Sequence, residues 1–441
     1  MQKSQEKTPL WRQLQATARV IQAVREGVSG GAAVEAVAAE LRPGVQALAF
    51  HVWRNLGRAE ALRKQLAKRP PPAAADALLC VALALGWTDE AAPYDAFTLV
   101  NQCVEAAKKN PATRMQASFI NACLRRFLRE RDALVQATDA DPQARWNHPL
   151  WWIQRLKKDH PEHWQTLLQA ANRQAPMALR VNALQNTVPS YLAELAQRGM
   201  AAHAIGSTGV EMASALPVGQ LPGFGEGRVS VQDAAAQMAA PLLLDGLPNR
   251  AGLRVLDACA APGGKTGHLL EAGVGQVTAL DVDAERCERI EQNLARLKLK
   301  AQVIAADAAH PERWWDGQPF DAILLDAPCT ASGIVRRHPD VRWLRRESDI
   351  AQLASMQALL LKTLWPLLAP GGRLLYCTCS VFRAEGSEQV QTFLANNTDA
   401  LLLPSPGHLI PAKTAKADGL PDNHIGDHDG FFYALLHKQP T

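Results

Sequence analysis

LRVLDACAAPGGKT, residues 253–266, decides the fold of this chain. Val255 and Leu256 belong to a short apolar strand, and a turn of small residues then leads through Gly263 and Gly264 into a helix. Because glycine lacks a β-carbon, the backbone there can take positive φ and approach a ligand closely. A strand, a glycine-containing turn and a helix in this order bring main-chain N–H groups to a nucleotide-like ligand in α/β proteins.

Two kinds of loop fit this stretch. GGKT resembles the end of a Walker A loop, but the first glycine of that pattern would fall on Cys259, and Pro262 interrupts the turn. FDAILLD, residues 320–326, similarly resembles a Walker B strand, so a P-loop NTPase is one alternative. The other is the nucleoside-binding loop of an S-adenosylmethionine (SAM) methyltransferase, which has no phosphates to bind.

From Pro241 onward, strands alternate with helices. The predicted strands are 253–257, QVTALD, QVIAAD, FDAILLD, GGRLLYCTCS and GFFYALLHK, with helices after Lys265, over 285–297 and over 349–368. Such alternation predicts a mostly parallel sheet with helices on both faces. We therefore assign residues 234–441 to a Rossmann-like domain, with a surface loop over 404–421.

The first 144 residues predict a different architecture. Apolar residues recur at helical spacing near 10–28, 32–40, 44–66, 73–86, 95–109 and 114–136, without period-two alternation. This indicates an all-helical domain. Residues 145–233 predict a small α+β segment with a strand at MALRVNAL and a helix over 188–197. For its four tryptophans, Trp146, Trp151, Trp152 and Trp164, core packing at a domain junction is favoured over stacking on bases.

Composition limits the class of protein. The 441 residues are 47% hydrophobic and 20% charged, with a net charge of +4, as in ordinary globular proteins. Residues 1–150 carry 20 Lys and Arg against 14 Asp and Glu, which permits nucleic-acid binding. The eight cysteines lack disulfide-framework spacing, and neither a signal region nor an 18-residue apolar run occurs. We expect a cytoplasmic protein with reduced thiols and no membrane association.

Three predicted strands end in aspartate, at Asp281, Asp307 and Asp326. In an open α/β sheet, the carboxyl ends of the strands line the ligand crevice. Asp281 follows Asp257 by 24 residues, about the spacing at which an acidic side chain binds ribose hydroxyls. Asp307 is placed to bind an adenine amino group. Each aspartate alone could instead cap the following helix, but that explanation is weak for all three together.

Two cysteines follow strands on the same edge, Cys329 after FDAILLD and Cys379 in YCTCS. A thiolate suits attack on an electron-poor ring carbon, but a free cysteine ionises only near pH 8.5. Cys377 shares a strand face with Cys379, and we assign it to strand packing. The Cys-x-Cys spacing with a lone third cysteine is no common zinc pattern, so no metal site is predicted.

Five stretches carry resemblances to two known families. SFINACLRRFLRE, residues 118–130, is similar to the last helix of the NusB-like RNA-binding fold. CAAPGGKT, DAPCTASG, RRHPDVRWLRR and YCTCS, in this order and spacing, resemble the Sun/Fmu (RsmB) family of RNA cytosine-5 methyltransferases. Together these resemblances cover essentially the whole chain.

This resemblance implies SAM-dependent methylation of a cytosine of 16S ribosomal RNA. Cys379 would be the nucleophile, Cys329 would assist release, and Asp326 would hold the cytosine. The implied SAM contacts are Cys259, Ala260, Ala261, Pro262, Gly263, Gly264, Lys265, Asp281, Asp307 and Asp326. Predicted RNA contacts are Arg125 and Arg126 in the NusB-like helix, and the cationic stretch Arg336, Arg337, Arg342, Arg345 and Arg346, expected beside the pocket.

Other functions stay open at this point. The same chemistry could act on tRNA, another RNA or DNA. The P-loop NTPase remains an alternative, and an RNA-binding module without catalysis would fit the N-terminal domain alone. We expect a monomer.

Overall fold

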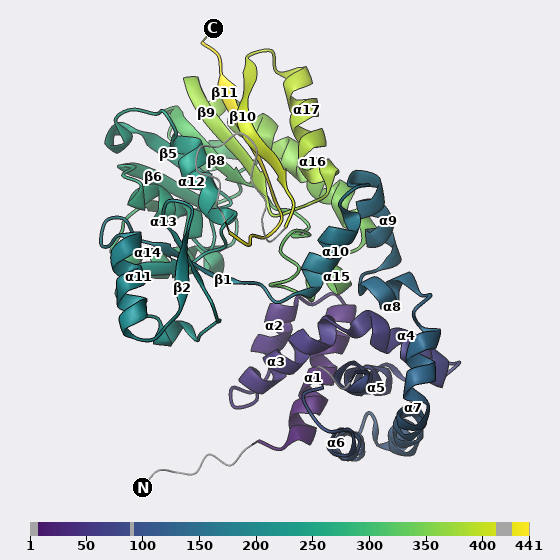
Figure 1. Ribbon diagram of the computed structural model, residues 1–441. Helices are drawn as coiled ribbons and strands as arrows, with labels where there is room; N and C mark the ends of the chain where they lie inside the picture. The colour runs from purple at the N-terminus through teal and green to yellow at the C-terminus, as the bar shows by residue number, and fades with distance from the viewer. Residues whose placement is uncertain (1–7, 89–91, 412–425, 441) are drawn as a thin grey trace. The chain divides into compact units, whose positions relative to one another are not determined.

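The computed structural model describes residues 8–88, 92–411 and 426–440 and divides into two compact units (Figure 1). One, here the helical unit, comprises residues 1–173 and 335–346. The other, here the α/β unit, comprises residues 174–334 and 347–441. The predicted boundaries at 144 and 233 therefore do not coincide with this division, because residues 145–173 and a later segment belong to the helical unit.

The helical unit is built around one apolar helix. Its helices are α1 (Leu10–Arg25), α2 (Gly30–Glu35), α3 (Arg42–Trp53), α4 (Leu56–Leu66), α5 (Ala73–Gly86), α6 (Ala96–Lys109), α7 (Ala117–Ala137), α8 (Pro142–Trp146), α9 (Leu150–Asp159), α10 (Trp164–Asn172) and α15 (Val341–Leu344). Helix α5 is buried from Ala75 to Leu85, and all of these residues are apolar except Asp76, which pairs with Arg25 and Arg63, as expected for a central helix. Helices α1, α3, α4, α6 and α7 contact it. Residues 8–88 and 92–173 contain no strand, which confirms the all-helical prediction.

The tryptophan-rich stretch packs within this unit, as predicted. Trp152 is buried, the rings of Trp146 and Trp164 meet edge to face at 5.2 Å, and Trp151 contacts Trp152 at the same distance. Lys157 lies 4.5 Å from the centre of the Trp164 ring. These aromatic contacts join α8, α9 and α10.

Residues 335–346 return to the helical unit after the chain has left it. The guanidinium of Arg342 is fully buried and donates to the carbonyl oxygens of Asn147 (3.0 Å) and Ala171 (2.6 Å). The Asp340 carboxylate accepts the Gly30 N–H at the start of α2, at 2.9 Å. A β-carbon on Gly30 would lie 2.7 Å from that carboxylate, so a larger residue there would displace the Asp340 side chain.

The α/β unit contains two sheets. The smaller is antiparallel, with strand order β2-β3-β1-β4, from β1 (Met177–Val181), β2 (Ala202–Ile205), β3 (Gly209–Met212) and β4 (Val229–Val231). Helix α11 (Val188–Gln197) packs against β2 and β3. The predicted small α+β segment is therefore present from residue 177 onward.

The larger sheet has seven strands in the order β10-β11-β9-β8-β5-β6-β7. They are β5 (Arg254–Ala258), β6 (Gln276–Asp281), β7 (Gln302–Ala305), β8 (Phe320–Asp326), β9 (Leu368–Thr378), β10 (Ala400–Leu409) and β11 (Phe431–Lys438). Strands β5 to β9 are parallel, whereas β10 and β11 form an antiparallel edge. This confirms the mostly parallel sheet. Strand β10 replaces the first part of the predicted loop over 404–421, and most of the rest lies outside the described residues.

Helices cover both faces of this sheet. On one face, Val255, Leu324 and Tyr433 pack with α12 (Ala239–Leu244), α13 (Gly264–Glu271) and α14 (Ala284–Leu297). On the other, Leu256 and Tyr376 pack with α16 (Glu347–Leu364) and α17 (Ser387–Asn396). Val255 and its neighbour Leu256 serve opposite faces because side chains alternate along a strand. From β5 the chain moves to β6 and β7 on one side and later to β8 and β9 on the other, so strand order reverses between β5 and β8. Ligands of open α/β sheets bind at such a switch point.

Candidate active site at the switch point

The loop after β5 lies at this switch point and takes positive φ at only one of the two predicted glycines, because Gly264 is already the first residue of α13. Cys259 takes φ +62° and Gly263 φ +89°. Helix α13 begins at Gly264, directly after the loop. A β-carbon on Gly263 would lie 3.1 Å from the Ile290 side chain and 3.2 Å from its Cα. Glycine thus permits both the left-handed backbone and the close packing of this loop against α14.

Asp281, at the end of β6, holds the same loop from its other side. Its Oδ2 accepts the Ala261 N–H at 3.0 Å, and its Oδ1 pairs with Arg286 at 3.3 Å. Arg286 in turn donates to the Ala261 carbonyl at 3.0 Å. Because Asp281 is buried and makes these contacts, its carboxylate stabilises the loop. Asp307 follows β7, is half-buried, and accepts the Ala309 N–H at 2.9 Å.

Asp326, the last residue of β8, pairs with the lysine of the loop. Lys265 Nζ lies 2.6 Å from Asp326 Oδ2, and the Cys377 thiol lies 3.5 Å from Oδ1. Burial alone would lower the pKa of Lys265, but the Asp326 carboxylate outweighs it and raises that pKa above its usual value. Lys265 therefore stays charged, and it lies at the edge of the sheet where the two cysteine strands end.

Asp257 is a buried carboxyl that sequence reasoning did not assign to the site. It ends the apolar part of β5 and accepts the Thr266 hydroxyl at 2.6 Å. Burial raises the pKa of Asp257 to about 7, against the lowering effect of the Thr266 hydrogen bond. The position of Asp257 directly before the predicted ligand-binding loop is the sequence feature that could have assigned it to the site.

The two cysteines expected at the strand ends meet in space. Cys329 Sγ lies 3.3 Å from Cys379 Sγ, and both residues are half-buried. The hydrogen bond to Cys379 and burial raise the pKa of the Cys329 thiol well above its usual value. Their loops are also joined through the main chain, since the Gly333 N–H donates to the Cys379 carbonyl at 2.9 Å. Cys377 is fully buried among the sheet residues, which confirms its assignment to strand packing.

The predicted RNA-binding arginines differ in exposure: Arg125, Arg126 and Arg346 are exposed, Arg337 and Arg345 are half-buried, and Arg336 and Arg342 are buried. Arg125 and Arg126 are exposed on α7, where Arg126 pairs with Glu130 at 2.9 Å. Arg336 and Arg342 are buried in the helical unit, and burial lowers the pKa of Arg342 to about 9. Both serve packing in this structure, so we leave them out of the proposed RNA contacts.

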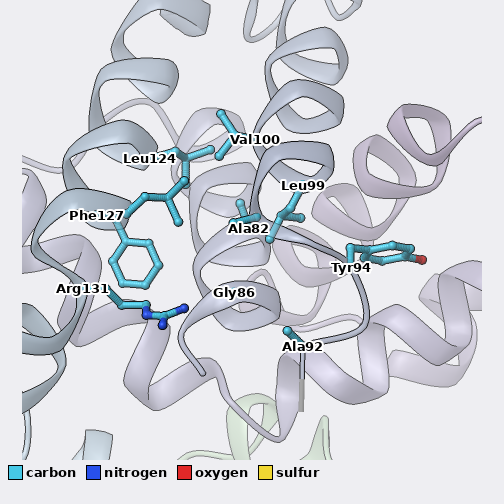
Figure 2. A pocket seen from close by; sticks show the side chains of 11 residues that line it. Ala82, Gly86, Ala92, Tyr94, Leu99, Val100, Leu124, Phe127 and Arg131 are labelled. Atoms are coloured by element: carbon cyan, nitrogen blue, oxygen red, sulfur yellow. The ribbon is translucent and has the colours of Figure 1, made fainter. Parts of the chain in front are cut away.

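The helical unit also contains a small cavity, shown in Figure 2. Its volume is about 20 Å³, and Ala82, Leu99, Leu124 and Phe127 supply apolar walls. This volume holds about one water molecule. The cavity is therefore a packing defect between α5, α6 and α7 rather than a ligand site.

Family comparisons divide the chain into three parts. The NusB family matches residues 13–129, the ferredoxin-like domain of RsmF/B-like methyltransferases matches 148–219, and the 16S rRNA methyltransferase RsmB/F family matches 245–437. The expected NusB-like domain is thereby confirmed, and the middle segment is identified as ferredoxin-like.

Full-length relatives agree with this division. Two relatives are named ribosomal RNA small subunit methyltransferase B. The Vibrio cholerae protein is 40% identical over 96% of this chain and 96% of its own length. The Pseudomonas putida protein is 42% identical over 89% of this chain and 89% of its own length. The crystal structure of PH0851 matches with a TM-score of 0.74 and 25% identity, covering 96% of this chain and 99% of that one. A methyltransferase homologue from Pyrococcus horikoshii matches 68% of this chain and 98% of its own, with a TM-score of 0.55 and 29% identity.

The Rossmann-like sheet, its switch-point loop and these matches define a methyltransferase with a NusB domain in front. The P-loop NTPase and the purely RNA-binding module are thereby excluded. The chain belongs to the RsmB/F family of 16S rRNA methyltransferases. Among the described residues, no helix is long and apolar enough to cross a membrane.

Proposed function

We propose that this protein transfers a methyl group from SAM to carbon 5 of a cytosine in 16S ribosomal RNA, through a transient bond between Cys379 and the base. The observation that carries the proposal is the 3.3 Å separation of Cys329 and Cys379 at the strand ends beside the loop. Relatives over nearly the whole chain are named as methyltransferases of small-subunit ribosomal RNA. Ribosomal RNA as substrate implies action in the cytoplasm.

The charges around the loop fit SAM better than a triphosphate. Burial raises the pKa of the Cys259 thiol beyond the usual range, and the carboxylates of Asp326, Asp281 and Asp257 raise it further. Lys265 and Arg286 are already paired with Asp326 and Asp281, so neither cation is left to bind the phosphates of a triphosphate. SAM carries a positively charged sulfur, and it supplies the methyl group when bound. The residues proposed to hold it are Cys259 to Lys265, Asp281, Asp307 and Asp326.

The cysteine pair supports distinct roles for its two members. Carbon 5 of cytosine is a poor nucleophile until a thiolate adds to carbon 6. In the proposed step a bond forms between Cys379 Sγ and carbon 6, and the π electrons of the 5,6 double bond move to carbon 5, which takes the methyl group. A base then takes the carbon 5 proton, the electrons of that C–H bond re-form the 5,6 double bond, and the Sγ–carbon 6 bond breaks with its electrons returning to Cys379.

Two neighbours favour Cys379 as the thiolate. The hydrogen bond to Cys379 and burial raise the pKa of the Cys329 thiol, so Cys329 keeps its proton and is the less suitable nucleophile of the two. The Lys265 ammonium, whose pKa the Cys379 charge helps to raise, stabilises a thiolate there in return. Cys329 is then available for the second half of the reaction. Asp326, 2.6 Å from Lys265, is proposed to hold the amino edge of the ring.

RNA contacts are proposed at the exposed Arg125 and Arg126 and at Arg337, Arg345 and Arg346. Guanidinium groups bind phosphates with little dependence on base sequence. The target base must also leave its stack to reach the cysteines, which costs a few kcal/mol and less in a loop.

Alanine variants of the two cysteines test the proposal. We expect C379A to lose methylation and to form no RNA adduct, whereas C329A should attack, transfer methyl and then accumulate RNA bound through Cys379. The adduct is measured as a slow band on denaturing gels that requires RNA. C123A, a buried cysteine on α7, is the matched control and should behave as the wild type.

One outcome would contradict the roles proposed for the two cysteines, and another would contradict the proposed substrate. An adduct in C379A together with a simply inactive C329A would reverse the two roles. Bisulfite mapping of ribosomal RNA from cells with and without the gene tests the substrate. A lost methylcytosine in tRNA, with 16S RNA unchanged, would replace the proposed substrate with tRNA.

A further inference from the structure

A single buried carboxylate lies behind the two cysteines. Glu385 ends the short 3-10 helix η7 (Arg383–Glu385) and has no exposed surface. Its Oε1 accepts the Thr330 N–H at 2.8 Å and the Gln357 side-chain N–H at 3.2 Å. Its Oε2 accepts the hydroxyls of Thr330 at 2.5 Å and of Ser380 at 2.6 Å. Both carboxylate oxygens therefore have two donors each.

The residues that Glu385 contacts are the immediate neighbours of the cysteines. Thr330 follows Cys329, and Ser380 follows Cys379, although the two pairs lie 50 residues apart in the chain. One carboxylate thus ties together the two loops whose sulfur atoms lie 3.3 Å apart.

Glu385 is itself held in place from two further elements. Its main-chain carbonyl accepts the Tyr376 hydroxyl at 2.8 Å and the Thr378 hydroxyl at 3.1 Å, which fixes η7 to β9. Gln357 of α16 donates to the Pro328 carbonyl at 2.8 Å as well as to Glu385. The carboxylate is therefore anchored to the sheet and to a helix, and it cannot follow one cysteine loop without the other.

We propose that Glu385 is a positioning residue that sets the separation and orientation of Cys329 and Cys379. The consequence for catalysis rests on the function proposed above, but the geometric role does not. A direct part in proton transfer is disfavoured because the carboxylate is buried and its two oxygens already accept four hydrogen bonds. Because buried polar networks fix a single arrangement when every member is satisfied, this one can hold two sulfur atoms within reach of one base.

Three variants separate geometry from charge. Glu385→Gln keeps one oxygen for the Thr330 and Gln357 N–H groups, and its amide can donate to the two hydroxyls, which are able to accept. Glu385→Ala removes the tie altogether. Asp399→Ala is the matched control, because Asp399 also accepts side-chain hydrogen bonds, from the Trp365 indole at 3.1 Å, but contacts neither cysteine loop.

The geometric role is tested without RNA or SAM. A bimane reagent that fluoresces only after both of its arms have reacted with thiols is added to the full-length protein, and peptide mapping identifies the linked cysteines. We expect Cys329–Cys379 cross-linking in the wild type, E385Q and D399A, and its loss in E385A. Wild-type cross-linking in E385A would overturn the proposal, as would loss in E385Q equal to that in E385A.

The catalytic consequence is measured in the same variants. A displacement of about 1 Å in a reacting group can cost roughly 100-fold in rate, so E385A should lose about that factor in kcat while its KM for SAM stays unchanged. E385Q should restore most of the rate, which a role for the negative charge would not allow. Wild-type kcat in E385A would contradict the positioning role.

The two proposals fail separately. If the wild type methylates no RNA but E385A still loses the cross-link, the proposed function is wrong and the geometric role stands. If E385A does not fold, the double variant T330V/S380A removes the same hydroxyl contacts from the other side, and retained cross-linking there overturns the proposal.

Discussion

Arg180 offers a sharp test of how the smaller sheet is attached to the loop-bearing helix. Its guanidinium in β1 donates to both carboxylate oxygens of Glu271 in α13, at 2.8 Å each, and neither side chain is more than 2% exposed. The same guanidinium donates to the Gly264 carbonyl at 2.8 Å and to Gln232. Arg180→Ala therefore leaves the Glu271 carboxylate buried without its partner.

The size of the effect follows from that burial. Breaking a buried ion pair by removing one partner costs about 3–5 kcal/mol, which corresponds to roughly 100-fold to several-thousand-fold in a local opening equilibrium. We expect amide hydrogen exchange, followed by mass spectrometry, to accelerate by this factor in peptides of β1 and α13. Peptides of the helical unit serve as the internal control. The SAM dissociation constant should rise as well, because Gly264 begins the helix after the loop.

A double variant makes the reasoning refutable. R180M/E271L removes both charges and fills similar volume, so it should exchange more slowly than R180A. Unchanged exchange in R180A would show that the ion pair contributes nothing. A double variant as unstable as R180A would show that packing, and not the orphaned carboxylate, causes the loss.

Three further predictions concern charge, oxidation and RNA. Burial raises the pKa of Asp257 in the folded protein to about 7, against an ordinary value of 3.8, so the contribution of Asp257 to stability is lost as pH rises between these values. The free energy of unfolding of D257N, measured in urea, should therefore rise relative to that of the wild type by about 3 kcal/mol between pH 5 and pH 8. A difference that stays constant over this pH range would refute the prediction. The oxidant diamide should form a disulfide between Cys329 and Cys379, whose sulfur atoms are 3.3 Å apart. This disulfide should abolish methylation until a thiol reductant is added. The prediction is contradicted if peptide mapping finds other cysteines linked instead. The double variant Arg125→Glu, Arg126→Glu should weaken RNA binding while the affinity for SAM stays unchanged. The slope of log affinity against log salt concentration should fall by about one for each phosphate that the arginines no longer neutralise. An unaltered salt slope would show that neither arginine contacts RNA.

Much of the fold could be predicted because its signals are local. Val255 and Leu256 sit on a short apolar strand that ends at a small-residue turn, and apolar strands likewise precede Asp281 and Asp326. Parallel strands bring their carboxyl ends to one edge, so the juxtaposition of Cys329 and Cys379 also followed from their places after strands.

The failures share a different physical cause. Arg336 and Arg342 lie in a run of arginines that predicts a solvated cationic surface, yet they are buried. The carbonyl oxygens that accept hydrogen bonds from Arg342 belong to Asn147 and Ala171, which lie far from it in the sequence, so the residues next to Arg342 give no sign of them. Glu385 was missed for the same reason, since its four donors come from segments that only the folded chain brings together.

The return of residues 335–346 to the helical unit has a consequence for synthesis on the ribosome. Residues 1–173 are made first, but 161 residues (174–334) intervene before the segment that carries Asp340 and Arg342 exists. At 5–20 residues per second this delay is roughly 8 to 30 s. During that time the Gly30 N–H and the Asn147 and Ala171 carbonyls lack the partners they have in the finished structure. The N-terminal bundle should therefore reach its final stability only after most of the Rossmann-like domain has emerged.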